Sequence, residues 1–130
     1  MNQGLLIALE GVDGSGTTSQ RERVAEALRA KGHQVHTTAE PTTGPIGKLL
    51  RDILTGNLQT SPQAVALLFA ADRLDHLERE ITPQLNQGHI VLTDRYIHSS
   101  LAYQSLAMGE DWVMAINQKA RLADLTILVK

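Results

Sequence analysis

A glycine-rich segment near the start of the chain has the residue types and the spacing of a phosphate-binding loop. We call residues 11–18 the phosphate loop: Gly11-Val12-Asp13-Gly14-Ser15-Gly16-Thr17-Thr18. The segment fits the pattern Gly-x-x-x-x-Gly-Lys-Ser/Thr, except that Thr17 replaces the lysine. Glycines let backbone N–H groups face a phosphate, and Thr18 has its hydroxyl where the motif binds Mg²⁺. The alternative is an ordinary glycine-rich turn between a strand and a helix.

Asp94 is a second candidate, because it follows the apolar run 89–93. Nucleotide-hydrolysing and kinase folds place a carboxylate at the end of a neighbouring strand, where it orients Mg²⁺ and its waters. The alternative is a loop aspartate or a helix cap. The residue and its place in the chain leave both interpretations open.

Phe69 and Arg73 lie four residues apart in a predicted helix, so they share one face. A flat ring and a forked donor can stack on a pyrimidine and bond its carbonyl edge. The alternative is a core phenylalanine beside a surface arginine.

Arg51 and Arg95 are candidates for binding a phosphate, since planar guanidinium groups bind such anions through two hydrogen bonds. A surface ion pair is the alternative for each.

Strands that alternate with helices must position these groups. Apolar runs predict strands at 5–9, 34–40, 89–93 and 125–129. Helical spacing predicts helices at 18–31, 46–54, 61–88, 99–107 and 111–122. Ser61 is a good N-cap for the longest helix, and Pro83 should kink or divide it. The alternation predicts an open parallel α/β sheet, whose ligands bind at the carboxyl ends of the strands.

The composition indicates one soluble domain, with 130 residues, 42% of them hydrophobic, and a formal net charge of −2. The chain has no cysteine, which excludes disulfides, a thiol nucleophile and cysteine-ligated metal sites. The near-neutral charge argues against a nucleic-acid partner. The first residues have neither the basic region of a signal peptide nor a membrane-spanning apolar length. We therefore expect a cytoplasmic protein without a membrane partner.

Six short segments, in this order, resemble the signature blocks of the thymidylate kinase family. They are Leu9–Gly16, Glu40-Pro41, Ile46-Gly47 with Arg51, Leu68–Arg73, Asp94–Tyr96 and Ser99–Gln104. The resemblance covers nearly the whole chain. It implies a P-loop nucleoside monophosphate kinase fold, with three α/β/α layers and helices on both faces of an open parallel sheet. It also implies a homodimer that phosphorylates dTMP to dTDP for dTTP biosynthesis, with ATP as donor and Mg²⁺ as cofactor.

The resemblance assigns the thymidine part of dTMP to four residues. Phe69 would stack on thymine, Arg73 would bond its exocyclic oxygen, and Ser100 would face the edge of the ring. Tyr103 would pack against the sugar and disfavour a 2′-hydroxyl. Glu40 would orient the arginines.

The resemblance also assigns the groups around the phosphates. Arg51 and Arg95 would contact the 5′-phosphate of dTMP, and Asp13 would bond the 3′-hydroxyl near the reacting phosphates. The phosphate loop would hold the phosphates of ATP, while Thr18 and Asp94 would hold Mg²⁺. Asp13, Arg95 and Asp94 would thus be the catalytic residues.

The chain departs from the family pattern in two respects. Thr17 replaces the loop lysine, and the loss of one preorganised charge commonly costs on the order of 10²-fold in rate, so phosphoryl transfer should be impaired. Family members also continue past the fourth strand with a lid and an adenine-binding region. We therefore expect residues 1–130 to be one P-loop nucleotide kinase domain that stops before those parts. The alternatives are a catalytically inactive nucleotide-binding relative and a non-catalytic P-loop-like interaction domain.

Overall fold

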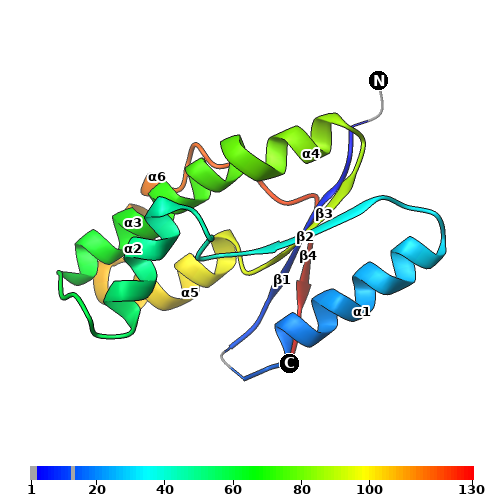
Figure 1. Ribbon diagram of the computed structural model, residues 1–130. Coiled ribbons are helices and arrows are strands. Elements are labelled where there is room, and N and C mark those ends of the chain that lie inside the picture. The colour runs from blue at the N-terminus through cyan, green and yellow to red at the C-terminus, as the bar shows by residue number, and fades with distance from the viewer. Residues whose placement is uncertain (1–2, 13) are drawn as a thin grey trace.

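The sheet is parallel and open, as the sequence predicts. The computed structural model describes residues 3–12 and 14–130. Its strands are β1 (Leu6–Glu10), β2 (Val35–Ala39), β3 (Ile90–Asp94) and β4 (Leu125–Leu128). All pairs run parallel in the order β2-β3-β1-β4, so all carboxyl ends lie at one edge (Figure 1). Asp94 is the last residue of β3 rather than the residue after it.

The helices follow the predicted alternation with shifted bounds. They are α1 (Thr17–Ala30), α2 (Pro45–Leu54), α3 (Pro62–His76), a π-helical segment (Leu77–Ile81), α4 (Thr82–Asn86), α5 (Ile97–Met108) and α6 (Glu110–Ile116). Ser61 caps α3 by accepting a hydrogen bond from the backbone of Ala64 at 3.1 Å. The long predicted helix is divided before Pro83, because the π-helical segment separates α3 from α4.

The prediction of a helix to residue 122 is wrong, because α6 ends at Ile116. Asn117 turns its side chain back into the protein. Its amide donates to the Val113 carbonyl at 2.9 Å, and its Oδ1 accepts from Arg73. A short polar side chain that bonds nearby backbone competes with continued helix, so the chain leaves the helix at this residue.

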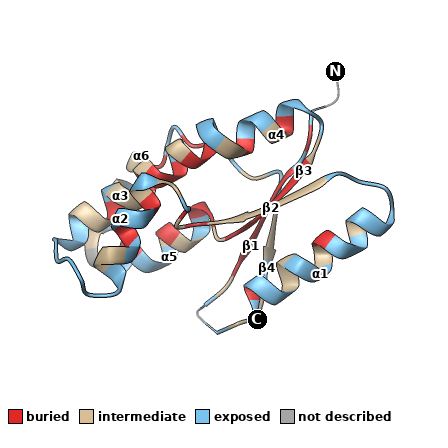
Figure 2. Cartoon of the chain, viewed as in Figure 1, coloured by how far each residue is buried: buried red, intermediate tan, exposed pale blue. Residues whose placement is uncertain are grey.

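Helices cover both faces of the sheet, which gives the predicted three layers. On β1, Leu6 and Ala8 pack in one apolar cluster with the π-helical segment, α4 and α5. Ile7 and Leu9 pack in a second cluster with α1. Alternate residues of a strand point to opposite faces, so one strand contributes to both clusters. Figure 2 shows that β1 and β3, the two central strands, are the buried ones.

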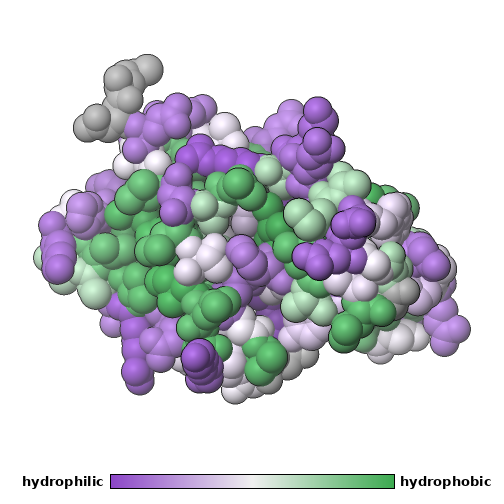
Figure 3. All heavy atoms as spheres, turned by 180° about the vertical axis from the view of Figure 1, so that it is seen from behind, coloured by the Kyte–Doolittle hydropathy of each residue, from purple (hydrophilic) through white to green (hydrophobic). Residues whose placement is uncertain are grey.

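The strand at the other side of β1 is more exposed. In β4, the side chains of Leu125 and Leu128 are more than half exposed, and so is that of Leu122, which precedes the strand. Apolar side chains also gather on the rear face of the molecule (Figure 3). Within the described ranges, no helix combines the length and the apolarity needed to cross a bilayer.

Candidate active site

Three buried carboxylates lie at the carboxyl edge of the sheet. Glu10 ends β1, Asp94 ends β3, and Glu40 follows β2 directly. The strand register places Leu9 and Ala39 on either side of Asp94, so the three acidic residues come from adjacent strands. They are 2%, 8% and 5% exposed, respectively. Buried carboxylates need partners, and each of the three has a different set.

The phosphate loop connects β1 to α1 through glycines that other residues could not replace without strain. Gly14 and Gly16 have φ angles of 81° and 89°, and Gly16 flanks the first turn of α1. A Cβ on Gly11 would lie 2.8 Å from the Val129 carbonyl oxygen. In the described part of the chain, no side chain caps α1, so its first N–H groups are available to an anion. Asp13 lies outside the described residues.

The side chain of Thr18, at the end of the phosphate loop, contacts Asp94 at the end of β3. The Thr18 hydroxyl donates to Oδ2 of Asp94. The other carboxylate oxygen, Oδ1, is buried and has no hydrogen-bond partner among the described residues. A threonine hydroxyl beside a carboxylate that has one unpartnered oxygen fits the preference of Mg²⁺ for hard oxygen ligands. Thr17, at the lysine position, is buried at the start of α1.

Glu10 holds the beginning of α5. Its carboxylate accepts hydrogen bonds from the backbone N–H groups of Tyr96 and Ser99, both at 3.2 Å, and from the Ser99 hydroxyl at 2.5 Å. A carboxylate at a helix N-terminus is favoured by the helix dipole. Glu10 therefore fixes the element that supplies Ser100 and Tyr103.

A left-handed turn directs Arg95 away from the sheet. Its φ is 77°, a conformation that costs a non-glycine residue roughly 1–2 kcal/mol. The Arg95 backbone N–H donates to the Leu9 carbonyl at 2.9 Å, and its carbonyl accepts from the Thr93 hydroxyl at 2.9 Å. These two bonds hold the turn. The Arg95 guanidinium lies over the Tyr103 ring, 5.8 Å from its centre.

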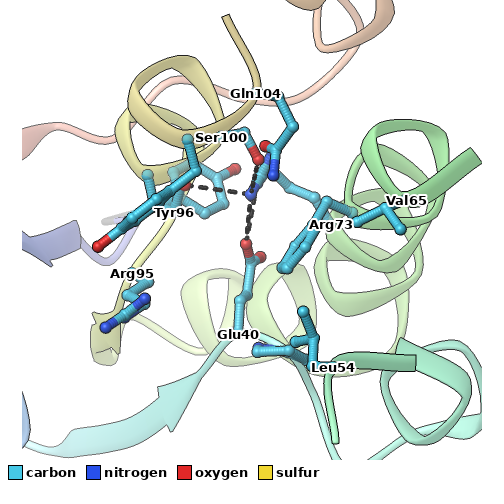
Figure 4. A pocket seen from close by; sticks show the side chains of 12 residues that line it. Glu40, Leu54, Val65, Arg73, Arg95, Tyr96, Ser100 and Gln104 are labelled. Atoms are coloured by element: carbon cyan, nitrogen blue, oxygen red, sulfur yellow. Dashed lines mark hydrogen bonds and ion pairs between the residues drawn. The ribbon is translucent and has the colours of Figure 1, made fainter. Parts of the chain in front are cut away.

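A cavity of about 520 Å³ opens beside these groups, and we call it the large cavity (Figure 4). It is lined by Glu40, Pro41, Leu54, Val65, Phe69, Arg73, Arg95, Tyr96, Ser99, Ser100, Tyr103 and Gln104. Five of these are predicted dTMP residues, and they come from α3, the β3–α5 turn and α5. Leu54, Val65 and Phe69 give the cavity an apolar wall opposite polar groups. That combination is typical of small-ligand sites of this size.

Arg73 is almost fully buried, at 1% exposure, so the alternative of a surface arginine is wrong. Its Nε donates to Oε1 of Glu40 at 2.9 Å, and its Nη2 donates to Ser100 Oγ at 3.0 Å and to the Tyr96 carbonyl at 3.1 Å. Its Nη1 donates to Asn117 Oδ1 at 2.5 Å. The guanidinium also lies 5.4 Å from the centre of the Tyr96 ring. Figure 4 shows Arg73 pointing from α3 toward Glu40 and Ser100.

Tyr96 is a neutral hydrogen-bond donor in this cluster. Its hydroxyl donates to the Arg121 carbonyl at 2.5 Å. Burial, with the negative charge of Glu40 adding to it, raises the pKa of this hydroxyl well above its usual range. Tyr96 thus stays protonated at any physiological pH.

Arg51 is placed differently from the other predicted residues, because it does not line the large cavity in the described structure. Its Nη1 donates to the Thr42 carbonyl and its Nη2 to the Pro41 carbonyl, both at 2.6 Å. Asp72 holds the same segment from α3 by accepting from the Thr42 backbone at 2.8 Å and hydroxyl at 2.6 Å. Arg51 therefore anchors the chain that follows β2 beside the cavity.

Sequence reasoning missed two residues of this cluster, His76 and Asn117. His76 Nδ1 bonds Oε2 of Glu40 at 2.9 Å, and Asn117 bonds Arg73. The signal for His76 was present, because it lies three residues after Arg73 and hence on the same face of α3. The sequence contains no comparable pattern for Asn117, since this residue lies just after α6 and contacts Arg73 of α3 only in the folded chain.

Comparisons with known proteins agree on one family. A family profile described as thymidylate kinase matches residues 9–130. The chain is 42% identical to the probable thymidylate kinase of Caldivirga maquilingensis over 127 residues, which cover 96% of this chain and 62% of that protein. It is 43% identical to the probable thymidylate kinase of Pyrococcus horikoshii over 133 residues, covering 98% of this chain and 65% of the relative. The chain thus spans less than two thirds of these relatives.

A solved structure shows the same fold. The crystal structure of thymidylate kinase from Ehrlichia chaffeensis matches 98% of this chain and 72% of its own chain, with a TM-score of 0.87 and 29% sequence identity. At that similarity the strands and helices correspond along nearly the whole of the chain.

Proposed function

The chain belongs to the thymidylate kinase family, and from this membership we propose that the protein transfers a phosphoryl group from ATP to dTMP. One observation carries the proposal most directly: five side chains that the family resemblance assigns to dTMP line the same cavity. They come from separate elements, so their convergence is a property of the fold. Thr18 and Asp94 meet close by, because Asp94 directly precedes Arg95 in the chain.

In the proposed acceptor site, Phe69 stacks on thymine and Arg73 recognises its edge. A guanidinium has five N–H donors, and the described partners use four of those on Arg73, leaving one on Nη1 for a ligand. Ser100 accepts from Arg73, so its own hydroxyl proton is available to an exocyclic oxygen of the base. Together these donors suit a pyrimidine that presents carbonyl oxygens.

The rest of dTMP is proposed to lie along Arg95 and Tyr103. Arg95 supplies positive charge to the 5′-phosphate, and its contact with the Tyr103 ring keeps both at the cavity wall. Tyr103 packs against the sugar and disfavours a 2′-hydroxyl. Arg51, on α2, is proposed from the family pattern alone to contact the same phosphate, because it does not line the large cavity in the described structure. Asp13 bonds the 3′-hydroxyl, a role proposed from the family pattern alone.

On the donor side, the backbone of the phosphate loop binds the phosphates of ATP at the N-terminus of α1. Thr18 and Asp94 are the residues that would hold Mg²⁺, and the ion, when bound, neutralises charge on the phosphates. Thr17 cannot supply the charge of a lysine, so we expect slow transfer with nucleotide binding retained. A homodimer and a cytoplasmic location stay predictions.

The observation at Thr17 also favours a second candidate function, a nucleotide-binding relative without catalysis. A coupled assay that follows the release of ADP from ATP separates the two. With dTMP as acceptor, ADP release above the rate without acceptor supports the kinase, and dCMP should give much less. Binding of dTMP without acceptor-dependent ADP release would support the inactive relative instead.

A further inference from the structure

We propose that His76 is a positioning residue for the pyrimidine site, acting through Glu40 on Arg73. The inference rests on the proposed function, because it concerns how the large cavity recognises a base. His76 does not line that cavity in the described structure, so it would touch no ligand there.

Glu40 is shared between Arg73 and His76. Its Oε1 accepts from Arg73 Nε at 2.9 Å and lies 2.8 Å from Nη2, while its Oε2 lies 2.9 Å from His76 Nδ1. An ionised carboxylate only accepts hydrogen bonds, so Nδ1 carries a proton and donates. His76 therefore fixes the torsion of the Glu40 carboxylate about the Cγ–Cδ bond.

The orientation of the Glu40 carboxylate affects its neighbours strongly, because all three side chains are buried. The side chains of His76, Glu40 and Arg73 are 0%, 2% and 1% exposed, so almost none of their surface is open to water. Each hydrogen bond among them is stronger than at the surface, and each lost partner is costly. Glu40 is itself held at the sheet edge, where its backbone N–H donates to the Asp94 carbonyl at 3.1 Å.

The other ring nitrogen of His76 is held from β2. Nε2 lies 2.7 Å from the Thr38 hydroxyl and 3.6 Å from Glu80 Oε1, and Glu80 Oε2 bonds His36 Nε2 at 2.6 Å. Burial alone would raise the pKa of Glu80, but hydrogen bonds from His36 and Thr38, together with the charges of His76 and His36, lower it. An ionised Glu80 thus stands beside the imidazole. The ring is clamped at both nitrogens and has one available orientation.

Loss of the Nδ1 donor has a specific consequence for Arg73. Oε2 of Glu40 would lose its partner, and the carboxylate could then rotate to face Arg73 with both oxygens, the favoured arrangement for such a pair. Nη2 of Arg73 would then bond Oε2 of Glu40 in place of Ser100 or the Tyr96 carbonyl, and the guanidinium would tilt within the cluster. The one N–H left for a ligand would point elsewhere, so binding of a pyrimidine would weaken.

The test compares three variants at one position. His76→Leu removes both ring nitrogens, His76→Asn keeps a donor near the place of Nδ1, and His76→Gln keeps a donor near the place of Nε2. His89→Leu is the matched control, since His89 bonds Gln84 at 2.7 Å and does not line the large cavity in the described structure. The dissociation constants of dTMP and ATP are measured by calorimetry on the full chain, and circular dichroism checks the fold.

We expect His76→Leu to weaken dTMP roughly tenfold, about 1.4 kcal/mol, with ATP affinity within about twofold. His76→Asn should recover most of the loss, and His76→Gln should not. Unchanged dTMP affinity in folded His76→Leu would overturn the inference. Equal losses for dTMP and ATP, or equal rescue by Gln and Asn, would likewise show a general structural role.

A second readout needs no ligand, so it separates this inference from the proposed function. The Nε–H of Arg73 is buried against Glu40 and should give a slowly exchanging NMR signal, which Arg73→Lys identifies by its loss. His76→Leu should shift that signal or speed its exchange, while His76→Asn should leave it near its wild-type position. If the wild type binds no dTMP, the proposed function fails, and this signal still decides the positioning role. An Arg73 signal unmoved by His76→Leu would contradict it.

Discussion

The large cavity and the phosphate loop lie at the same edge of the sheet but rest on different parts of the chain. The cavity depends on side chains, and its central group, Arg73, is buried in an ion pair with Glu40. The loop depends on backbone N–H groups and on glycines at 11, 14 and 16. Recognition by a side chain is lost when that side chain is replaced, whereas recognition by backbone N–H groups does not depend on the side chain at position 17. This difference explains how the loop can lack its lysine and still be expected to bind a nucleotide.

The largest effect should come from breaking the buried pair in the cavity. Arg73→Leu removes the buried positive charge that pairs with Glu40 and leaves that carboxylate with His76 as its remaining side-chain partner, so the free energy of unfolding should fall by about 3–5 kcal/mol. Urea denaturation measures it. The matched control is Arg79→Leu, because Arg79 makes an exposed pair with Asp75 and its side chain is 63% exposed. If the free energy of unfolding fell by a similar amount in both variants, the buried pair would contribute no more to stability than the exposed one.

The next effect separates the acceptor from the donor. Arg95→Ala should weaken dTMP by about 2–5 kcal/mol, as for other desolvated charge contacts, and should change ATP far less. Calorimetric titrations with the two nucleotides provide the comparison. An equal loss for both would contradict the role of Arg95 at the acceptor phosphate.

A smaller effect tests the loop. Thr17→Lys restores the motif and should raise the rate of phosphoryl transfer on the order of 10²-fold, with little change in ATP affinity, because the added charge acts mainly on the transferring group. Ser19→Lys adds the same charge two residues away and should not raise the rate. If Thr17→Lys leaves the rate unchanged while ATP still binds, the missing lysine is not what limits transfer.

The smallest effect concerns how the Glu80 carboxylate changes the stability of the fold with pH. The folded state lowers the pKa of Glu80 below its ordinary value of 4.5, so the ionised group stabilises the fold at pH above about 5. That contribution is lost as the pH falls through the folded pKa. The stability difference between the wild type and Glu80→Gln should therefore be largest near neutral pH and vanish in acid. A difference that grows on acidification would reverse the sign assigned here.

The sequence predicted the positions of the strands well, because β1 and β3 are apolar runs buried on both faces. The family resemblance also named five residues that the structure brings to one cavity, and their roles toward dTMP stay predictions. The resemblance implied that Glu40 orients the arginines, and Glu40 does pair with Arg73. The sequence could not predict that Asn117 would also bond Arg73, since Asn117 reaches that residue from a distant segment. The end of α6 was missed for the same reason, because the side chain that stops the helix, Asn117, bonds a residue of α3. Local pattern specifies elements, while long-range polar contacts appear only once the chain is folded.

A calorimetric titration of this chain with dTMP, with the ribonucleotide form of TMP as control, tests the proposed acceptor site most directly. We predict saturable binding of one dTMP per chain and markedly weaker binding of the ribonucleotide, because Tyr103 packs against the sugar. Binding of dTMP should also be lost in Arg73→Leu if that variant folds. Absence of dTMP binding by a chain with the circular dichroism spectrum of a folded α/β protein would contradict the assignment of the large cavity.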